Sequence, residues 1–96
     1  MSDEYFQRAS ELKDYPFDWG AVMDLDNDQI STSTFSVQPT GLTIDTPAPT
    51  KTAITATVWC TGGTPGQTYK VWNSIVTVAG RKYTDFIRVR IHNTNE

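Results

Sequence analysis

Cysteine, histidine and long apolar runs are scarce or absent in this chain of 96 residues. Cys60 is the one cysteine, which excludes an internal disulfide and a multi-cysteine zinc site, so we interpret it as a small apolar core residue. Nowhere do about twenty apolar residues follow one another, and we therefore expect no membrane partner. The N-terminus also lacks the basic start and the apolar run of a signal peptide, so we expect synthesis in the cytoplasm.

Basic residues are outnumbered, because 8 lysines and arginines face 11 aspartates and glutamates, for a formal net charge of −3. This balance argues against nucleic acid as a partner, since binding to phosphate backbones depends on clustered lysine and arginine. The charges are also segregated: acidic residues crowd the first third, and Arg81, Lys82, Arg88 and Arg90 lie towards the end. Such a distribution fits a solvated surface, and it also permits electrostatic complementarity between copies or with a neighbouring protein.

Leucine and alanine are scarce in the middle of the chain, where threonine and serine dominate, so we predict strands there. Alternation supports this prediction: in TAITATVWC, the apolar residues Ile54, Ala56, Val58 and Cys60 share one face. The predicted strands span residues 15–19, 30–38, 42–45, 52–60, 67–79 and 82–92. Short strands separated by glycine and proline at this spacing are typical of an antiparallel β-sandwich.

The stretch TGGTPGQTYKVW concentrates turn residues directly before one of these strands. Gly62, Gly63 and Gly66 tolerate positive φ, and Pro65 fixes φ near about −65°. We therefore expect a sharp chain reversal that lets Tyr69 enter the core at the start of the next strand.

Few residues suggest metal binding or catalysis. Asp24, Asp26 and Asp28 in DLDND match the first three acidic positions of a calcium-binding loop, but Gln29 and Phe35 stand where that loop needs its glycine and its bidentate glutamate. We interpret the segment as a solvated acidic loop, with calcium as the alternative. His92 has no partner nearby in sequence and Cys60 lies on an apolar face, so we expect no enzymatic activity, no metal and no cofactor.

Aromatic and apolar residues outside the predicted core are the candidate interface. Trp59 and Trp72 lie opposite the aliphatic stripes of their own strands, either packed under a loop or arm, or exposed as a patch for protein contacts. Residues 1–13 fall outside the strand pattern and are predicted to form an arm, either helical or extended. The candidate interface residues are Tyr5, Phe6, Leu12, Trp59 and Trp72.

Three segments together resemble a family of small immunoglobulin-like proteins encoded in the structural gene clusters of tailed phages and prophages. They are DYPFDW, ISTSTFSV and TGGTPGQTYKVWNSIVTVAGR, in this order and with a threonine-rich strand between the last two. Phe35 stands at the usual tryptophan position of the family, and Val78 is a smaller departure. The resemblance implies that the matching positions define the fold and carry no catalysis: Asp14, Tyr15, Asp18, Trp19, Gly62, Gly63, Gly66, Tyr69, Asn73, Gly80 and Arg81.

From pattern and resemblance together, we predict a single all-β, immunoglobulin-like antiparallel β-sandwich at residues 14–92, with a short N-terminal arm at 1–13 and a polar tail at 93–96. The expected function is that of a non-enzymatic virion structural protein, an adaptor joining fibre to tail or neck. Its expected partners are other virion proteins, which it would contact in several copies through the arm, disordered until it docks. The alternatives are a capsid cement protein, a fibre's own terminal domain and, from another class, a carbohydrate-binding module for the host surface.

Overall fold

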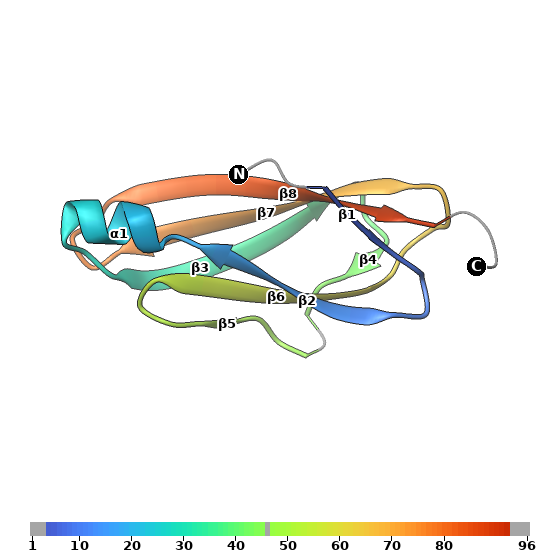
Figure 1. Cartoon of the computed structure of the whole chain (residues 1–96), viewed down its shortest axis with the longest axis horizontal. Helices are drawn as coiled ribbons and strands as arrows, with labels where there is room; N and C mark the ends of the chain where they lie inside the picture. Colours follow the sequence, from blue (N-terminus) through green and yellow to red (C-terminus); the bar gives the residue numbers. More distant parts are fainter. Residues whose placement is uncertain (1–3, 46, 93–96) are drawn as a thin grey trace.

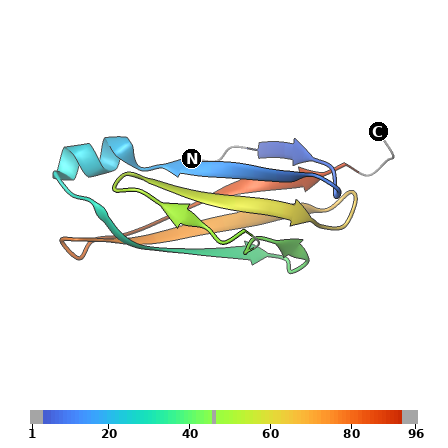
Figure 2. The same ribbon diagram turned by 90° about the horizontal axis from the view of Figure 1, so that it is seen from below.

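Two β-sheets pack face to face in the computed structural model, which describes residues 4–45 and 47–92 (Figures 1 and 2). The elements in chain order are β1 (Glu4–Gln7), β2 (Leu12–Asp18), α1 (Gly20–Asp26), β3 (Ile30–Gln38), β4 (Leu42–Thr43), β5 (Thr50–Lys51), β6 (Thr55–Gly62), β7 (Thr68–Thr77) and β8 (Lys82–Ile91). One sheet has the order β1-β8-β7-β3 and the other the order β2-β6-β4, with β5 added alongside β6. The division of strands between the sheets follows the pattern of an immunoglobulin sandwich, and the prediction of an all-β sandwich is confirmed.

The core forms where the inward faces of the two sheets meet. Every second residue of β6 and β7 is buried, as the alternation in the sequence predicts, because successive side chains of a strand point to opposite faces. The aromatic residues of the YPFDW segment, Tyr15, Phe17 and Trp19, are buried as well. Burial of this apolar area is the main stabilising term for so small a domain.

The connection from β6 to β7 confirms the expected reversal before Tyr69. The Tyr69 ring is buried, and its hydroxyl accepts a hydrogen bond of 2.8 Å from the backbone N–H of Thr64. Gly63 adopts a φ of +93°, and a Cβ built there would lie 2.9 Å from Cγ1 of Ile91. A glycine is thus required by backbone conformation and by space together.

A buried polar network connects the start of α1 to the centre of the β3–β7 pair. The indole Nε1–H of Trp19 donates to Oδ1 of Asn73 at 2.9 Å. The Asn73 amide nitrogen in turn donates to Oγ of Ser33 at 2.8 Å and to the carbonyl oxygen of Thr34 at 3.2 Å. Asn73 is fully buried, so these contacts satisfy groups that would otherwise be costly to bury.

The N-terminal segment differs from the predicted free arm. Over residues 4–13 the chain belongs to the sandwich: β1 pairs in parallel with β8, and β2 begins at Leu12 in the other sheet. The physical reason is the buried side chain of Gln7, whose amide donates to the carbonyl oxygen of Cys60 at 3.0 Å and accepts from the hydroxyl of Tyr15. Residues 1–3 of the predicted arm and the predicted tail at 93–96 lie outside the described residues.

A short helix, α1, replaces the loop that the acidic segment predicts. The carboxylate of Asp18 accepts the backbone N–H of Gly20 at 2.8 Å as the helix begins, and the buried side chain of Met23 anchors it to the core. Asn27 ends the helix in a left-handed conformation with a φ of 51°. No helix among the described residues is both long and apolar enough to cross a membrane.

Candidate interaction surfaces

The described residues include five large apolar side chains that are exposed, and the register of their segments places them towards the two ends of an elongated molecule with principal extents of 46 × 23 × 19 Å. They are Leu25 (86% exposed), Val78 (70%), Phe6 (51%), Leu12 (49%) and Ile54 (46%). Leu25, Ile54 and Val78 form what we call the α1 end, and Phe6 and Leu12 form the β1 end. Ile54 directly precedes β6, whereas Leu12 pairs with Thr61 close to the other terminus of that strand. The two ends are therefore separated by roughly 20 Å along the strands.

Asp28 holds the α1 end together. Its carboxylate forms an ion pair of 2.9 Å with Arg81 and accepts the backbone N–H groups of Gln29 at 2.8 Å and Ala79 at 3.2 Å. Hydrogen bonding, above all from the side chain of Thr77, lowers the pKa of Asp28 to about 2. Asp28 thus ties the segment after α1 to the turn between β7 and β8.

The structure gives no support for a calcium site in the acidic segment. The oxygens of Asp28 are engaged in the contacts to the β7–β8 turn, and Asp24 lies on α1 instead of in a loop. Among the side chains that the structure describes, there is no group of three or more acidic, histidine or cysteine side chains that could hold a metal ion.

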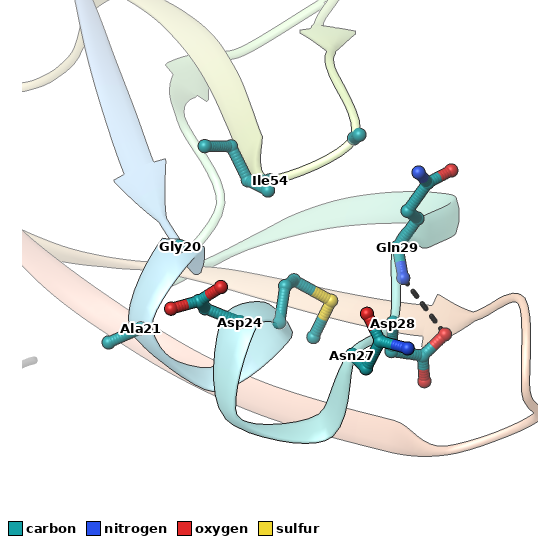
Figure 3. Close-up of a pocket in the computed structure, with 9 residues that line it drawn as sticks. Gly20, Ala21, Asp24, Asn27, Asp28, Gln29 and Ile54 are labelled. Atoms are coloured by element: carbon teal, nitrogen blue, oxygen red, sulfur yellow. Dashed lines mark hydrogen bonds between the residues drawn. The ribbon is translucent and has the colours of Figure 1, made fainter.

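An open hollow of about 460 Å³ lies at the α1 end, between the helix and the segment that leads into β6 (Figure 3). Ile54 stands on one side of it, and α1 with Asp24 on the other. Its lining comprises Gly20, Ala21, Met23, Asp24, Asn27, Asp28, Gln29, Ala53 and Ile54. None of these residues is a serine, cysteine or histidine, and the mixture of apolar and polar groups suits a side chain of another protein better than a chemical step.

The outward surface of the β1-β8-β7-β3 sheet carries an aromatic and cationic cluster. The rings of Trp72 and Phe86 lie 4.7 Å apart, and the charged groups of Lys70 and Arg88 each lie 5.1 Å from the centre of the Phe86 ring. Trp72 is half-buried by these neighbours. We call this surface the cationic face; its charged residues are Lys70, Lys82, Arg88, Arg90 and Glu4.

The outward surface of the β2-β6-β4 sheet has the opposite charge. Asp14 lies directly across from Trp59 in the β2–β6 pair, and Asp18 lies across from Thr55. The remaining outward positions of β6 are threonines, and Trp59 is half-buried among them. We call this surface the acidic face. Of the acidic residues in the first third, Asp14 and Asp18 lie on this face, whereas Glu4 lies on the cationic face. Arg81 lies on neither face and is paired with Asp28.

The five interface residues predicted from the sequence do not form one patch. Trp59 and Trp72 lie on the two opposite faces. Phe6, near the His92 ring at 5.9 Å, and Leu12 lie at the β1 end. Tyr5 is half-buried and packs on the Tyr15 ring at 4.8 Å, so it contributes to the sandwich itself.

The apolar residues of the α1 end were not predicted as interface residues, and Ile54 was predicted on the buried face of its strand. It is 46% exposed, because β6 begins only after it. Leu25 lies between two aspartates, and Val78 directly precedes the turn formed by Ala79 and Gly80. Such positions fall outside the regular pattern of core residues, and several of them together on the surface mark a candidate contact region.

Comparison with known proteins identifies the family. Residues 7–90 match the model of the family described as "Podophage GP4 fiber-tail adaptor protein gp77". The chain belongs to this family. Membership in this fibre-tail adaptor family makes it a structural protein of the phage virion, and the resemblance seen in the sequence is confirmed. Among curated proteins, no match to the chain was found.

Proposed function

We propose that the chain joins a fibre to the tail by binding one of these proteins at its α1 end and the other at its β1 end. One observation carries the proposal: the exposed large apolar side chains of the described residues gather at opposite ends of an elongated, rigid sandwich. An adaptor requires two separate binding surfaces, and a rigid body between them fixes the geometry of its two partners.

The α1 end supplies both an apolar surface and a recess. Leu25 and Val78 are held on segments that Asp28 connects, so their positions are fixed before a partner arrives. Complete burial of one such side chain contributes about 1.5–3 kcal/mol, and little ordering cost opposes it on a fixed scaffold. The neighbouring hollow accepts a partner's side chain.

The virion contains several copies of the adaptor, arranged by the symmetry of the particle, and the adaptor performs no chemistry of its own. The capsid cement and carbohydrate-binding functions remain as alternatives, and binding assays with the same purified chain and its variants can test them. A cement protein binds the capsid shell protein through one of its ends. A carbohydrate-binding module binds host polysaccharide and loses that binding in Trp59→Ala or Trp72→Ala.

The test is a binding assay with the tail and fibre proteins of the same particle, each immobilised separately. We expect the double variant Leu25→Asp, Val78→Asp to lose one of the two proteins and to keep the other. We expect Phe6→Asp, Leu12→Asp to show the reverse pattern. Thr34→Asp, Ser36→Asp, on exposed positions of β3, is the matched control for two added negative charges and keeps both proteins.

Circular dichroism with thermal melting confirms that each variant is folded before binding is measured. The proposal is wrong if both end variants lose the same protein, or if neither loses any. Loss of capsid shell binding or of polysaccharide binding in these assays would instead support the corresponding alternative.

A further inference from the structure

In the described part of the chain, the cationic face carries four positive side chains and one negative side chain, Glu4, which lies opposite Arg88 in the β1–β8 pair. Among residues 4–45 and 47–92, no carboxylate lies within ion-pair distance of Lys70, Lys82, Arg88 or Arg90. Lys70 and Arg88 are direct cross-strand neighbours, and both approach the ring of Phe86. Like charges in directly opposite positions of a sheet repel each other, and here Glu4 on the other side of Arg88 and the Phe86 ring offset part of this repulsion. A chain with an overall net charge of −3 thus maintains a locally positive surface.

The acidic face is the counterpart of this surface in the same chain. Asp14 lies beside Trp59 in the middle of the β2–β6 pair, just as Lys70 and Arg88 lie beside Trp72 and Phe86 on the other sheet. Within the described part of the chain, Asp14 forms no ion pair. Each face therefore combines a central, half-buried tryptophan with uncompensated charge, and the two signs are opposite.

From this complementarity we infer that copies of the chain stack side by side, the cationic face of one copy against the acidic face of the next. The aspartates of one copy then neutralise the lysine and arginine residues of its neighbour, and the two tryptophans lie near the centre of the contact. The long sides of the molecule measure 46 by 23 Å and 46 by 19 Å, so a sheet face has an outline of roughly 900–1,000 Å². A standard stable interface buries about 800 Å² per partner.

Two different faces meet in this contact, so the interface is heterologous, and repetition produces a ring or an open stack. Side-by-side stacking leaves the α1 end of every copy uncovered, and in a ring all copies direct this end to the same side. Phe6 and Leu12 of the β1 end lie at the margins of the cationic and the acidic face, on the outward sides of β1 and β2. The inference rests on the charges of the two faces, whereas the proposed function rests on the exposed apolar residues.

Sedimentation velocity of the purified chain tests the inference, with concentrations up to about 1 mM so that weak association is detected. At about 10 mM salt, where the Debye length is about 30 Å, we expect concentration-dependent self-association; at about 1 M salt, where it is about 3 Å, we expect monomers. We expect Arg88→Glu and Asp14→Lys each to weaken self-association by about tenfold or more, because each places like charges in contact.

Rescue of self-association by a second charge reversal distinguishes this contact from other modes of association. We expect the double variant Arg88→Glu, Asp14→Lys to associate again, and also an equimolar mixture of the two single variants, because opposite charges then meet once more. Lys51→Glu on β5 and Asp24→Lys on α1 make the same charge changes away from the centre of either face, and they leave association unchanged.

Three results would overturn the inference: a chain that stays monomeric at low salt, single reversals that associate like the wild type, and reversals that are not rescued by each other. The last result would indicate that the cationic face binds a different acidic protein. Binding of tail and fibre proteins by the Arg88→Glu and Asp14→Lys variants, measured in parallel, reports separately on the proposed function of the ends.

Discussion

Asn73→Leu should destabilise the sandwich although leucine is apolar and has the same number and branching of side-chain heavy atoms. The substitution leaves the indole N–H of Trp19 buried without an acceptor, in a position where it now donates to Asn73 at 2.9 Å. An unsatisfied buried donor costs about 1–3 kcal/mol, and the contacts to Ser33 and Thr34 are lost in addition. Water can reach the partly buried Ser33 and the exposed Thr34, so we expect a total loss of about 2–3 kcal/mol in the free energy of unfolding.

The assay is thermal unfolding followed by circular dichroism, with urea unfolding as an independent measure. For a domain of this size, a loss of about 2–3 kcal/mol lowers the Tm by roughly 10–20 °C. Trp19→Phe provides the decisive comparison, because it removes the indole N–H. We expect this change to cost about 1–2 kcal/mol less in the Asn73→Leu background than in the wild type. If the two substitutions change the free energy of unfolding additively, or if the Asn73→Leu variant is as stable as the wild type, this hydrogen-bond network does not stabilise the sandwich.

Two further predictions concern the turns that join the sheets. The pKa of Asp28 is lowered from 3.8 to about 2 in the folded chain, so its stabilising contribution is fully present above pH 3.8 and is lost as the pH falls towards 2. Asp28→Asn should therefore lower the Tm at neutral pH and flatten the Tm profile between pH 2 and 4; an unchanged slope would contradict this. Gly63→Ala and Gly80→Ala form a matched pair, with φ of +93° and +94°, but only Gly63 has close neighbours for a Cβ, at 2.9 Å. We expect Gly80→Ala to cost about 1 kcal/mol and Gly63→Ala at least about 1 kcal/mol more in urea unfolding, and equal costs would show that Ile91 gives way.

The sandwich could be predicted because its strands follow simple periodicity. In β7, Tyr69, Val71 and Ile75 alternate with outward residues. An alternation of apolar and polar residues with a period of two is compatible with few structures other than a β-strand. The turn before Tyr69 could be predicted for a similar reason, because few residues other than glycine adopt a positive φ.

Contacts that depend on distant partners could not be predicted in the same way. The sequence EYFQ does not reveal that Gln7 becomes buried, because its partners, Tyr15 and the carbonyl of Cys60, are brought to it only by the folded sheets. For the same reason Asp28 appeared to be part of a solvated loop, whereas Arg81 and Ala79 approach it from a turn more than fifty residues away. The grouping of Leu25, Ile54 and Val78 likewise arises from three separate segments.

The parallel pairing of β1 with β8 determines how the sandwich responds to pulling forces. Glu4 and Ile91 lie at opposite ends of two strands that run in the same direction, so tension between them slides one strand along the other. The evenly spaced hydrogen bonds of a parallel pair are then strained simultaneously, whereas the bonds of a hairpin open one at a time. The side chain of Gln7 adds a cross-link from β1 to the second sheet. A chain pulled at Glu4 and Ile91 is therefore expected to resist extension as a mechanical clamp.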